Sequence, residues 1–305
     1  MIEALNAQAK KLINPSPAFY NEPMIGLSNL LTENSCFDKV FFANSGAEAN
    51  EGAIKLARKW GQLHKNGAFE IITFDHSFHG RTIATMSASG KPGWDTMFAP
   101  QVPGFPKADL NDLESVKKLV TDKTVAVMLE PVQGEGGFIP VPKRFLEKIR
   151  QVCDDHGIVF IADEVQAGAG RTGKFLSIEH SGVVPDVVTM AKSIGSGLPI
   201  SAITGKAEIM DAPHLGGIGG TYSGSPIAVA GALATVKEII KPEFLNRATH
   251  VGKIITDRIN AMKESKERHE RRAGVTDSAA RQFDRGRAGI VRGKQRRDPH
   301  PGHDG

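Results

Sequence analysis

Short apolar runs alternate with helical patterns between residues 39 and 192, and this alternation limits what the chain can fold into. The runs are bounded by turn residues and span 39–43, 69–74, 125–129, 158–162 and 187–191. Short bounded runs are typical of strands buried on both faces. Helical spacing lies between them, most clearly at 49–60 and 142–156. The order predicts an α/β fold, with a mostly parallel, doubly wound sheet and helices on both faces.

Two charged residues follow neighbouring apolar runs. Asp163 comes directly after 158–162, and Lys192 directly after 187–191. We expect both at the carboxyl ends of strands, where open α/β sheets bind ligands. A buried charge is costly unless something pairs with it, so the two side chains either have a functional role or form a structural ion pair. These two residues alone leave both possibilities open.

A strand, a tight turn and a helix are predicted around Ser45-Gly46-Ala47. In this geometry the backbone amides at the helix N-terminus can hold a phosphate. Ser45 and Glu48 also have the spacing of a capping box, in which side chains satisfy those amides. Both interpretations can hold together.

Polar residues also follow two other predicted strands. Residues 75–82 carry His79 and Arg81 beside an aromatic residue, which favours a site more than any one of them alone. Glu130 and Glu135 lie in a glycine-rich loop and suit metal ligands or a general acid and base. Because no His or Asp stands nearby at ligand spacing, we expect no metal.

Elsewhere the chain has fewer signals. We expect Ile200–Thr204 to form an edge strand and residues 90–113 to form a long surface loop. Pro226 after Ser225 predicts a helix start near Ile227, and Pro242 its end.

Composition narrows the class of protein. No apolar run approaches the roughly 18 residues of a membrane span, and the N-terminus lacks a signal-peptide pattern, so we expect a cytoplasmic protein. Cys36 and Cys153 are too few for a disulfide framework. Residues 264–305 hold nine Arg and two Lys against three Glu and four Asp, which equals the net charge of +4 of the whole chain. The basic character therefore belongs to this tail, and we do not expect nucleic acid as a partner of the rest.

Taken together, the motifs resemble those of the class III, or omega-amino acid, aminotransferases, which carry pyridoxal 5'-phosphate on the fold type I scaffold. The resemblance covers roughly residues 5–260 and is specific in combination. Its motifs, in chain order, are SGAEAN, FHGRT, EPVQGEGG, ADEVQAGAGRTG, MAKSIGSG and GGTYSGSP. This order of motifs favours a functional role for Asp163 and Lys192 over a purely structural ion pair.

The resemblance implies catalytic roles for these two residues. Lys192 would hold the cofactor as a Schiff base and then act as the base that moves a proton from substrate to cofactor. Asp163 would face the pyridine nitrogen and keep it protonated, so that the ring acts as an electron sink.

The resemblance also implies the remaining cofactor contacts. Phe78 and Val165 would cover the two faces of the ring, with Gln166 near its hydroxyl. Backbone groups of Gly46 and Ala47 would take the phosphate. The cofactor-binding set is completed by Ser45, His79 and Thr221, the last reaching the phosphate of a partner subunit, so we expect a homodimer with shared active sites.

Substrate residues follow in the same way. Arg81 stands where some family members hold a substrate carboxylate. Glu135 matches a residue that pairs with an Arg of the C-terminal domain and moves away when a dicarboxylate such as 2-oxoglutarate enters. The donor stays open: SPAFYNEPMIGL and SGKPGWD resemble acetylornithine aminotransferases, whereas MAKSIGSGLPISA resembles 4-aminobutyrate aminotransferases.

The resemblance suggests how the chain is organised. Residues 1–37 match part of an N-terminal segment, 38–240 the cofactor-binding large domain, and 241–263 a helix leading to a small domain whose motifs do not follow. We interpret 264–305 as a disordered tail, from an altered reading frame on a truncated gene. The alternative is a catalytically inactive protein of the same fold whose Arg-rich tail binds nucleic acid.

Overall fold

The computed structural model describes residues 1–263, and its internal contacts divide the chain into a unit at Met1–His250 and a second unit that begins at Val251. The expectations for the tail at 264–305 lie outside the described residues. Within 1–263, no helix combines the length and the apolar character needed to cross a membrane. The cytoplasmic location stays a prediction.

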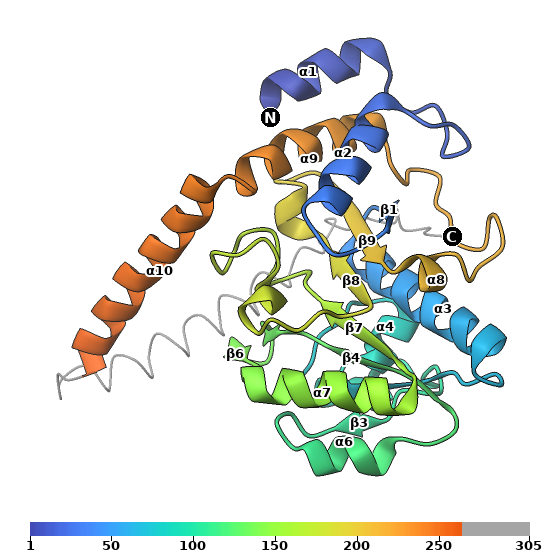
Figure 1. Ribbon diagram of the computed structural model, residues 1–305. Coiled ribbons are helices and arrows are strands. Elements are labelled where there is room, and N and C mark those ends of the chain that lie inside the picture. The colour runs from blue at the N-terminus through green and yellow to red at the C-terminus, as the bar shows by residue number, and fades with distance from the viewer. Residues whose placement is uncertain (264–305) are drawn as a thin grey trace, which may run out of the picture. The chain divides into compact units, whose positions relative to one another are not determined.

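A seven-stranded sheet forms the centre of the first unit, in the order β1-β9-β8-β7-β4-β2-β3 (Figure 1). Its strands are β1 (Lys39–Ala43), β2 (Glu70–Phe74), β3 (Lys107–Ala108), β4 (Thr124–Leu129), β7 (Val159–Asp163), β8 (Val187–Met190) and β9 (Ser201–Gly205). The neighbours from β8 to β3 are parallel, whereas β9 is antiparallel to both β8 and β1. The predicted mostly parallel α/β sheet is confirmed. β5 (Val132–Gln133) and β6 (Ile139–Pro140) form a separate antiparallel pair.

The strand predicted at Ile200–Thr204 exists, but its expected place at the edge is wrong. β9 lies between β8 and β1, and every residue of β9 is buried. The edge is β1, which pairs with β9 from Lys39↔Gly205 to Ala43↔Ser201. The pairing joins segments about 160 residues apart in the chain. The sequence near either strand therefore does not indicate which strand it pairs with.

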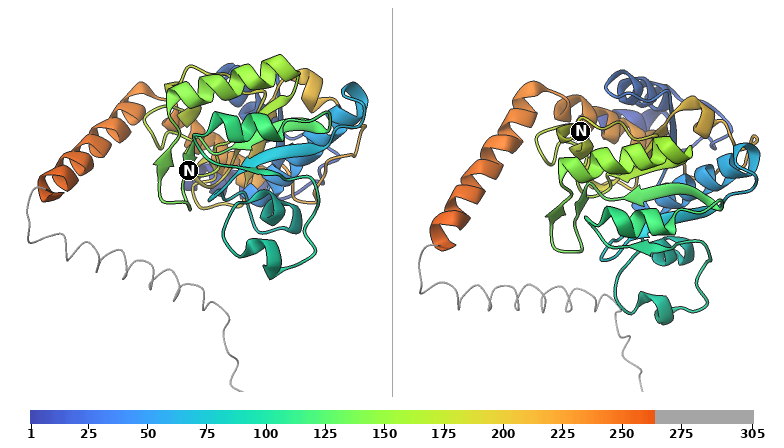
Figure 2. Two further views of the ribbon diagram at one scale, coloured as in Figure 1. Left: turned by 90° about the horizontal axis from the view of Figure 1, so that it is seen from below. Right: turned by 60° about the horizontal axis from the view of Figure 1, so that its bottom comes forward.

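The helices and 3₁₀ turns surround the sheet in the order α1 (Ile2–Lys11), α2 (Glu22–Glu33), α3 (Gly46–His64), α4 (Ile83–Ala88), α5 (Trp94–Met97), α6 (Leu113–Leu119), α7 (Lys143–His156), η1 (Ser177–His180), η2 (Lys192–Ile194), α8 (Ala207–Met210), α9 (Pro226–Ile239) and α10 (Pro242–Lys263). The helix predicted near Ile227 begins at Pro226, as expected. Figure 2 shows α6 and α7 side by side.

Two apolar cores cover the two faces of the sheet. Phe160 and Val127 belong to the core beneath α2, α7 and α9, whereas their chain neighbours Ile161 and Met128 belong to the core beneath α3. This alternation follows from the two-residue period of strand side chains. Helices therefore cover both faces, as the sequence predicts.

The long surface loop expected at residues 90–113 is partly wrong. The segment contains α5 and the edge strand β3, which is parallel to β2. Trp94 is buried, and Lys107 donates hydrogen bonds to three backbone carbonyls and to Thr73. The glycine and proline residues of the segment favour a loop, and the short strand β3 forms because it pairs with β2.

Candidate active site

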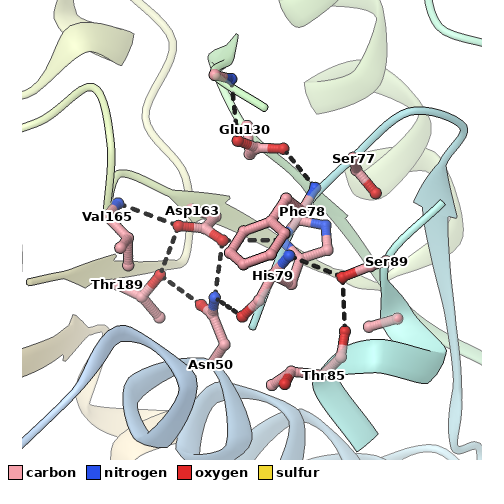
Figure 3. A network of polar contacts seen from close by, with 12 residues as sticks. Asn50, Ser77, Phe78, His79, Thr85, Ser89, Glu130, Asp163, Val165 and Thr189 are labelled. Atoms are coloured by element: carbon pink, nitrogen blue, oxygen red, sulfur yellow. Dashed lines mark hydrogen bonds and ion pairs between the residues drawn. The ribbon is translucent and has the colours of Figure 1, made fainter. Parts of the chain in front are cut away.

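Asp163 ends β7 and is 3% exposed (Figure 3). Its Oδ2 accepts a hydrogen bond from Nδ2 of Asn50 at 2.7 Å and lies 2.8 Å from Nδ1 of His79. Its Oδ1 accepts from the amide of Val165 at 3.0 Å. Thr189 Oγ1 donates to Asn50 Oδ1 at 2.7 Å, which fixes the amide so that its NH₂ group faces Asp163. Residues from four segments therefore hold one buried carboxylate in a single orientation.

The partner of Asp163 is His79. Within residues 1–263, the ion pair that Asp163 forms is with His79, and Lys192 does not reach it. Because the carboxylate accepts, Nδ1 of His79 carries the proton. His79 Nε2 is buried without a hydrogen-bond partner among the described residues. The structural ion pair considered for Asp163 and Lys192 is therefore not formed.

Lys192 lies two residues beyond the end of β8, the parallel neighbour of β7. Its φ of 48° is in the left-handed region, which is costly for a residue with a side chain and is common at functional sites. Partial burial lowers the pKa of its amine, against the opposing effect of the carboxylates of Asp163, Glu135 and Glu130. A lowered pKa increases the fraction of neutral, nucleophilic amine.

The N-terminus of α3 faces this pair of residues. Ser45 Oγ accepts from the Glu48 amide at 3.2 Å, and Glu48 Oε2 accepts from the Ser45 amide at 3.1 Å, so the predicted capping box is confirmed. The amides of Gly46 and Ala47 have no acceptor in the described part of the chain. A 19-residue helix thus presents two free N–H donors where its dipole favours an anion.

Gly46 brings this helix close to the loop after β7. A Cβ added at Gly46 would lie 2.7 Å from Val165 Cγ1 and 3.6 Å from the Cβ of Ala191. Real side chains do not approach this closely, so the glycine is required for the contact. It places the free amides beside the segments that carry Asp163 and Lys192.

The segment 76–90 after β2 closes on itself. The His76 amide donates to the Gly90 carbonyl at 2.9 Å, and the Gly90 amide donates to the Ser77 carbonyl at 3.2 Å. Inside it, Ser89 Oγ accepts from the His79 amide at 2.8 Å. A Cβ at Gly90 would lie 2.2 Å from the Phe74 carbonyl oxygen, so the closure requires glycine. The closed segment fixes His79 beneath Asp163.

Two cations lie against two aromatic rings near the same segment. Phe78 and Trp94 contact edge to face, with ring centroids 5.6 Å apart. Arg81 Cζ lies 5.8 Å from each centroid, and Lys91 Nζ lies 5.4 Å from that of Trp94 and 5.9 Å from that of Phe78. Lys91 Nζ is also 3.5 Å from Oε2 of Glu135.

Glu130 proves more buried than its sequence context suggests. It is 2% exposed, and its oxygens accept from the amides of Phe78 at 2.9 Å and Gly134 at 3.3 Å. Burial raises the pKa of its carboxyl to about 7, partly offset by His79. Glu130 thereby connects the loop that carries Phe78 with the loop that carries Glu135.

Asn50 belongs to the site but is not among the site residues that the sequence predicts. It is 1% exposed and shares the buried face of α3 with Ala53 and Ala57. A polar residue at a helix position that periodicity assigns to the core is the signal that could have found it.

Two expected cofactor residues lie further out. Gln166 lies against the loop after β4, since a Cβ at Gly134 would be 2.6 Å from its Nε2. Thr221 is exposed, and its carbonyl accepts from Asn14 at 3.4 Å. In the described part of the chain, no three His, Cys, Asp or Glu residues form a cluster that could bind a metal.

Known proteins resemble this chain in sequence and fold. An acetylornithine aminotransferase of Ralstonia nicotianae is 61% identical over 249 residues, which is 80% of this chain and 62% of that protein. The crystal structure of N-acetylornithine aminotransferase from Stenotrophomonas maltophilia has a TM-score of 0.73 at 34% identity, over 86% of this chain and 65% of the other. An ornithine aminotransferase of Toxoplasma gondii has a TM-score of 0.81 at 32% identity, with 86% and 63% covered. The chain thus spans about three fifths of the curated relative's length.

The Toxoplasma structure is described with pyridoxal phosphate at its active site, and class III aminotransferases depend on this cofactor. The residues of the present chain fit such a group. Free amides at the N-terminus of α3 suit a phosphate, a buried carboxylate suits a protonated ring nitrogen, and an amine of lowered pKa suits an aldehyde. The chemical groups at the site, and not only the sequence similarity, are therefore compatible with this cofactor.

The family model for class-III aminotransferases matches residues 1–275, which is most of the chain. The match includes every element of the site described above. Together with the mostly parallel sheet and the position of Asp163 and Lys192 at its carboxyl edge, this shows that the chain belongs to the class-III aminotransferase family.

Proposed function

We propose that this protein is a transaminase that moves the terminal amino group of an N-acetylornithine-type donor to 2-oxoglutarate, with pyridoxal phosphate attached at Lys192. The observation that carries the proposal is the meeting of three features at one sheet edge. These are the buried carboxylate of Asp163, the amine of Lys192, whose backbone lies in the left-handed region, and the free amides of Gly46 and Ala47.

Lys192 has two tasks in this proposal. Its Nζ is the attachment point for the cofactor aldehyde, for which its lowered pKa is suited. Once displaced by the donor amine, the same Nζ takes the proton from the substrate carbon that bears the amine. Pyridoxal phosphate supplies the electron sink that accommodates the negative charge left on that carbon.

Asp163 maintains a negative charge for the ring nitrogen. Asn50 and Val165 donate hydrogen bonds to its two oxygens, and His79 contacts it from behind. Because these partners fix the carboxylate before anything binds, no reorganisation is needed when the ring arrives.

The remaining residues would bind and orient the cofactor. The amides of Gly46 and Ala47 would donate to its phosphate beside Ser45, and Phe78, Val165 and Gln166 would hold its ring. We further propose a homodimer in which the exposed Thr221 contacts the phosphate bound by the partner subunit.

Arg81 and Glu135 act on the substrate. The guanidinium of Arg81 is exposed and forms no ion pair within residues 1–263, so it is available for a substrate carboxylate. The donor is proposed as N-acetylornithine because the similar proteins of Ralstonia and Stenotrophomonas carry that name.

The test combines a spectrum with a donor screen. Purified protein with pyridoxal phosphate is expected to show a visible absorption band that Lys192→Ala abolishes and Lys148→Ala, an exposed lysine of α7, retains. Glutamate formation from 2-oxoglutarate is then measured with N-acetylornithine, ornithine and 4-aminobutyrate. Lys192→Ala should lower turnover by about 1,000-fold, the scale of a lost general base.

The outcomes separate the parts of the proposal. A band that persists in Lys192→Ala contradicts the assigned attachment point. A Lys192-dependent band without turnover of any donor contradicts the proposed activity but not the cofactor. Faster turnover of 4-aminobutyrate than of N-acetylornithine contradicts the proposed donor.

A further inference from the structure

Trp94 is a buried aromatic residue to which the proposed function assigns no role. It is 6% exposed and begins the short helix α5. The turn before it has Pro92 and Gly93 in its middle, with Gly93 at φ 79° and ψ −1°, and the Trp94 amide donates to the Lys91 carbonyl at 3.2 Å. These are the features of a type II turn, in which glycine adopts the positive φ without strain. The turn thereby fixes where Trp94 lies relative to segment 76–90.

The indole of Trp94 packs against Phe78, the residue that we propose contacts the cofactor ring. The two ring centroids are 5.6 Å apart, and the interplanar angle is 63°. The Phe78 amide donates to Oε1 of Glu130 at 2.9 Å (Figure 3). Glu130 thus holds the backbone of Phe78, while the edge-to-face contact with Trp94 restricts the direction of its ring.

Arg81 contacts the same indole. Its side chain is exposed, and its Cζ lies 5.8 Å from the centroid of Trp94 and 5.8 Å from that of Phe78. An unrestrained arginine samples many rotamers and loses this freedom when it binds a carboxylate. Contact with aromatic faces restricts the guanidinium before a ligand arrives. Trp94 therefore contacts both a residue proposed for the cofactor and a residue proposed for the substrate.

Deepening the proposed function and resting on it, we propose that Trp94 is a positioning residue that holds Phe78 and Arg81 in one fixed arrangement. Through Phe78 it sets the tilt of the aromatic ring at the cofactor site. Through Arg81 it orients the guanidinium for the substrate carboxylate. A change at Trp94 should therefore alter the surroundings of the cofactor and the affinity for the substrate together.

The probe is 2-acetamidopentanoate, which has the carboxylate and the acetamide of N-acetylornithine but lacks the terminal amine that reacts. Its affinity for the full chain loaded with pyridoxal phosphate is measured by calorimetry. Trp94→Met fills the space without an aromatic face and is expected to weaken this binding about tenfold, the scale of one side chain that must be newly ordered. Trp94→Phe should retain most of the affinity. The visible circular dichroism of the bound cofactor should weaken in Trp94→Met and recover in Trp94→Phe.

A second substitution tests whether Trp94 acts through Arg81. Because Arg81→Ala removes the guanidinium, adding Trp94→Met to Arg81→Ala should cause no further loss of affinity. Trp60→Met is the matched control, since Trp60 is the other tryptophan of the chain and packs beside His64 on α3. It should change neither the affinity nor the dichroism.

The position of Arg81 is also measurable in the wild type, without a substitution at Trp94. Ring currents of Phe78 and Trp94 should shift the NMR signal of the Arg81 Nε–H group away from that of a free arginine, with or without cofactor. Loss of one signal in Arg81→Lys assigns it.

Three results would each overturn the proposal: an unshifted Arg81 signal in the wild type, equal effects of Trp60→Met and Trp94→Met, or additive losses from Trp94→Met and Arg81→Ala. If the Lys192-dependent absorption band and the turnover of N-acetylornithine are nevertheless present in the wild type, the proposed function stands and only the role of Trp94 fails. A wild type without that band contradicts the proposed function. An Arg81 shift that disappears in Trp94→Met would in that case still support the contact by which Trp94 positions Arg81.

Discussion

Glu164, directly after Asp163 in the chain, has a different task from its neighbour. Its carboxylate accepts from the Ser177 amide at 3.0 Å, the Ser177 hydroxyl at 2.6 Å and the Ile178 amide at 2.7 Å. These donors begin the 3₁₀ turn η1. Complete burial nevertheless raises the pKa of Glu164 to about 7, since three hydrogen bonds do not replace its lost hydration.

This raised pKa predicts a stability that depends on pH. Between about pH 4.5 and 7 the folded chain retains a proton on Glu164 that the unfolded chain has lost. The free energy of unfolding therefore falls as pH rises through this window, by on the order of 3 kcal/mol. Glu164→Gln does not titrate, so its stability should fall less over the same window, measured by urea unfolding at several pH values.

Glu147→Gln provides the control, because Glu147 is an exposed carboxyl of α7. Its curve should run parallel to that of wild type. If the Glu164→Gln curve is parallel as well, the buried carboxyl of Glu164 is not the group responsible.

The limits of sequence reasoning are clear at this scale. The strand-end positions of Asp163 and Lys192 follow from local apolar patterns and are confirmed. The partners of Asp163 are not local, since Asn50 lies 113 residues away and His79 lies 84 residues away. Hydrogen bonds between distant segments depend on the packed fold, so the local sequence around Asn50 does not indicate its contact with Asp163.

The long helix α3 packs closely against the sheet at its C-terminal end. A Cβ at Gly61 would lie 2.1 Å from the Ala68 carbonyl oxygen and 2.6 Å from Val125 Cγ2. The carbonyl oxygen of Ala68 is a backbone atom and cannot move away by a change of rotamer. The C-terminal turn of α3 therefore passes directly over the start of β2, which fixes the direction of the helix whose other end presents the free amides.

Gly61→Ala is accordingly expected to destabilise the fold by about 1–3 kcal/mol, the usual cost of overpacking. Gly252→Ala, in the exposed part of α10, has no atom within 4 Å of the added Cβ and should not lower the stability. Urea midpoints of both variants check this. Equal midpoints for the two alanine variants would mean that α3 does not approach the sheet so closely.

Element type was easier to predict than element pairing. The capping box at Ser45 and the helix start at Pro226 depend on a few neighbouring residues and are confirmed. The interior place of β9 depends on β1, and the short β3 depends on β2. Both pairings join strands that are separated along the chain. The residues around each strand therefore do not indicate which partner it will pair with.

For the whole molecule, the two units differ in what stabilises them. The first contains both apolar cores, whereas side chains at 252–262 of α10 are exposed, including Ile255 and Ile259. A helical segment of this length without buried contacts is marginal in water. The stability of the chain is therefore concentrated before residue 251.

Hydrogen exchange can measure this difference. Amides at 253–263 should exchange on the order of 100-fold faster than those at 49–61 in α3, because local opening there breaks few apolar contacts. Mass spectrometry of peptic fragments resolves the two regions. Similar protection in both would show that the exposed part of α10 is stabilised by contacts beyond those described.

The closure of segment 76–90 has a consequence for how such proteins can diverge. The two ends of the segment meet at Gly90. A recombination event could therefore replace the whole segment without changing the path of the neighbouring strands. His79 and Arg81 would be inherited together. The hydrogen-bonding partner of Asp163 and the proposed contact with a substrate carboxylate would therefore be exchanged as one unit. Lys91 lies one residue beyond the closure, so an exchange of this segment would place the incoming Arg81 against a Trp94 and beside a Lys91 that belong to the original chain.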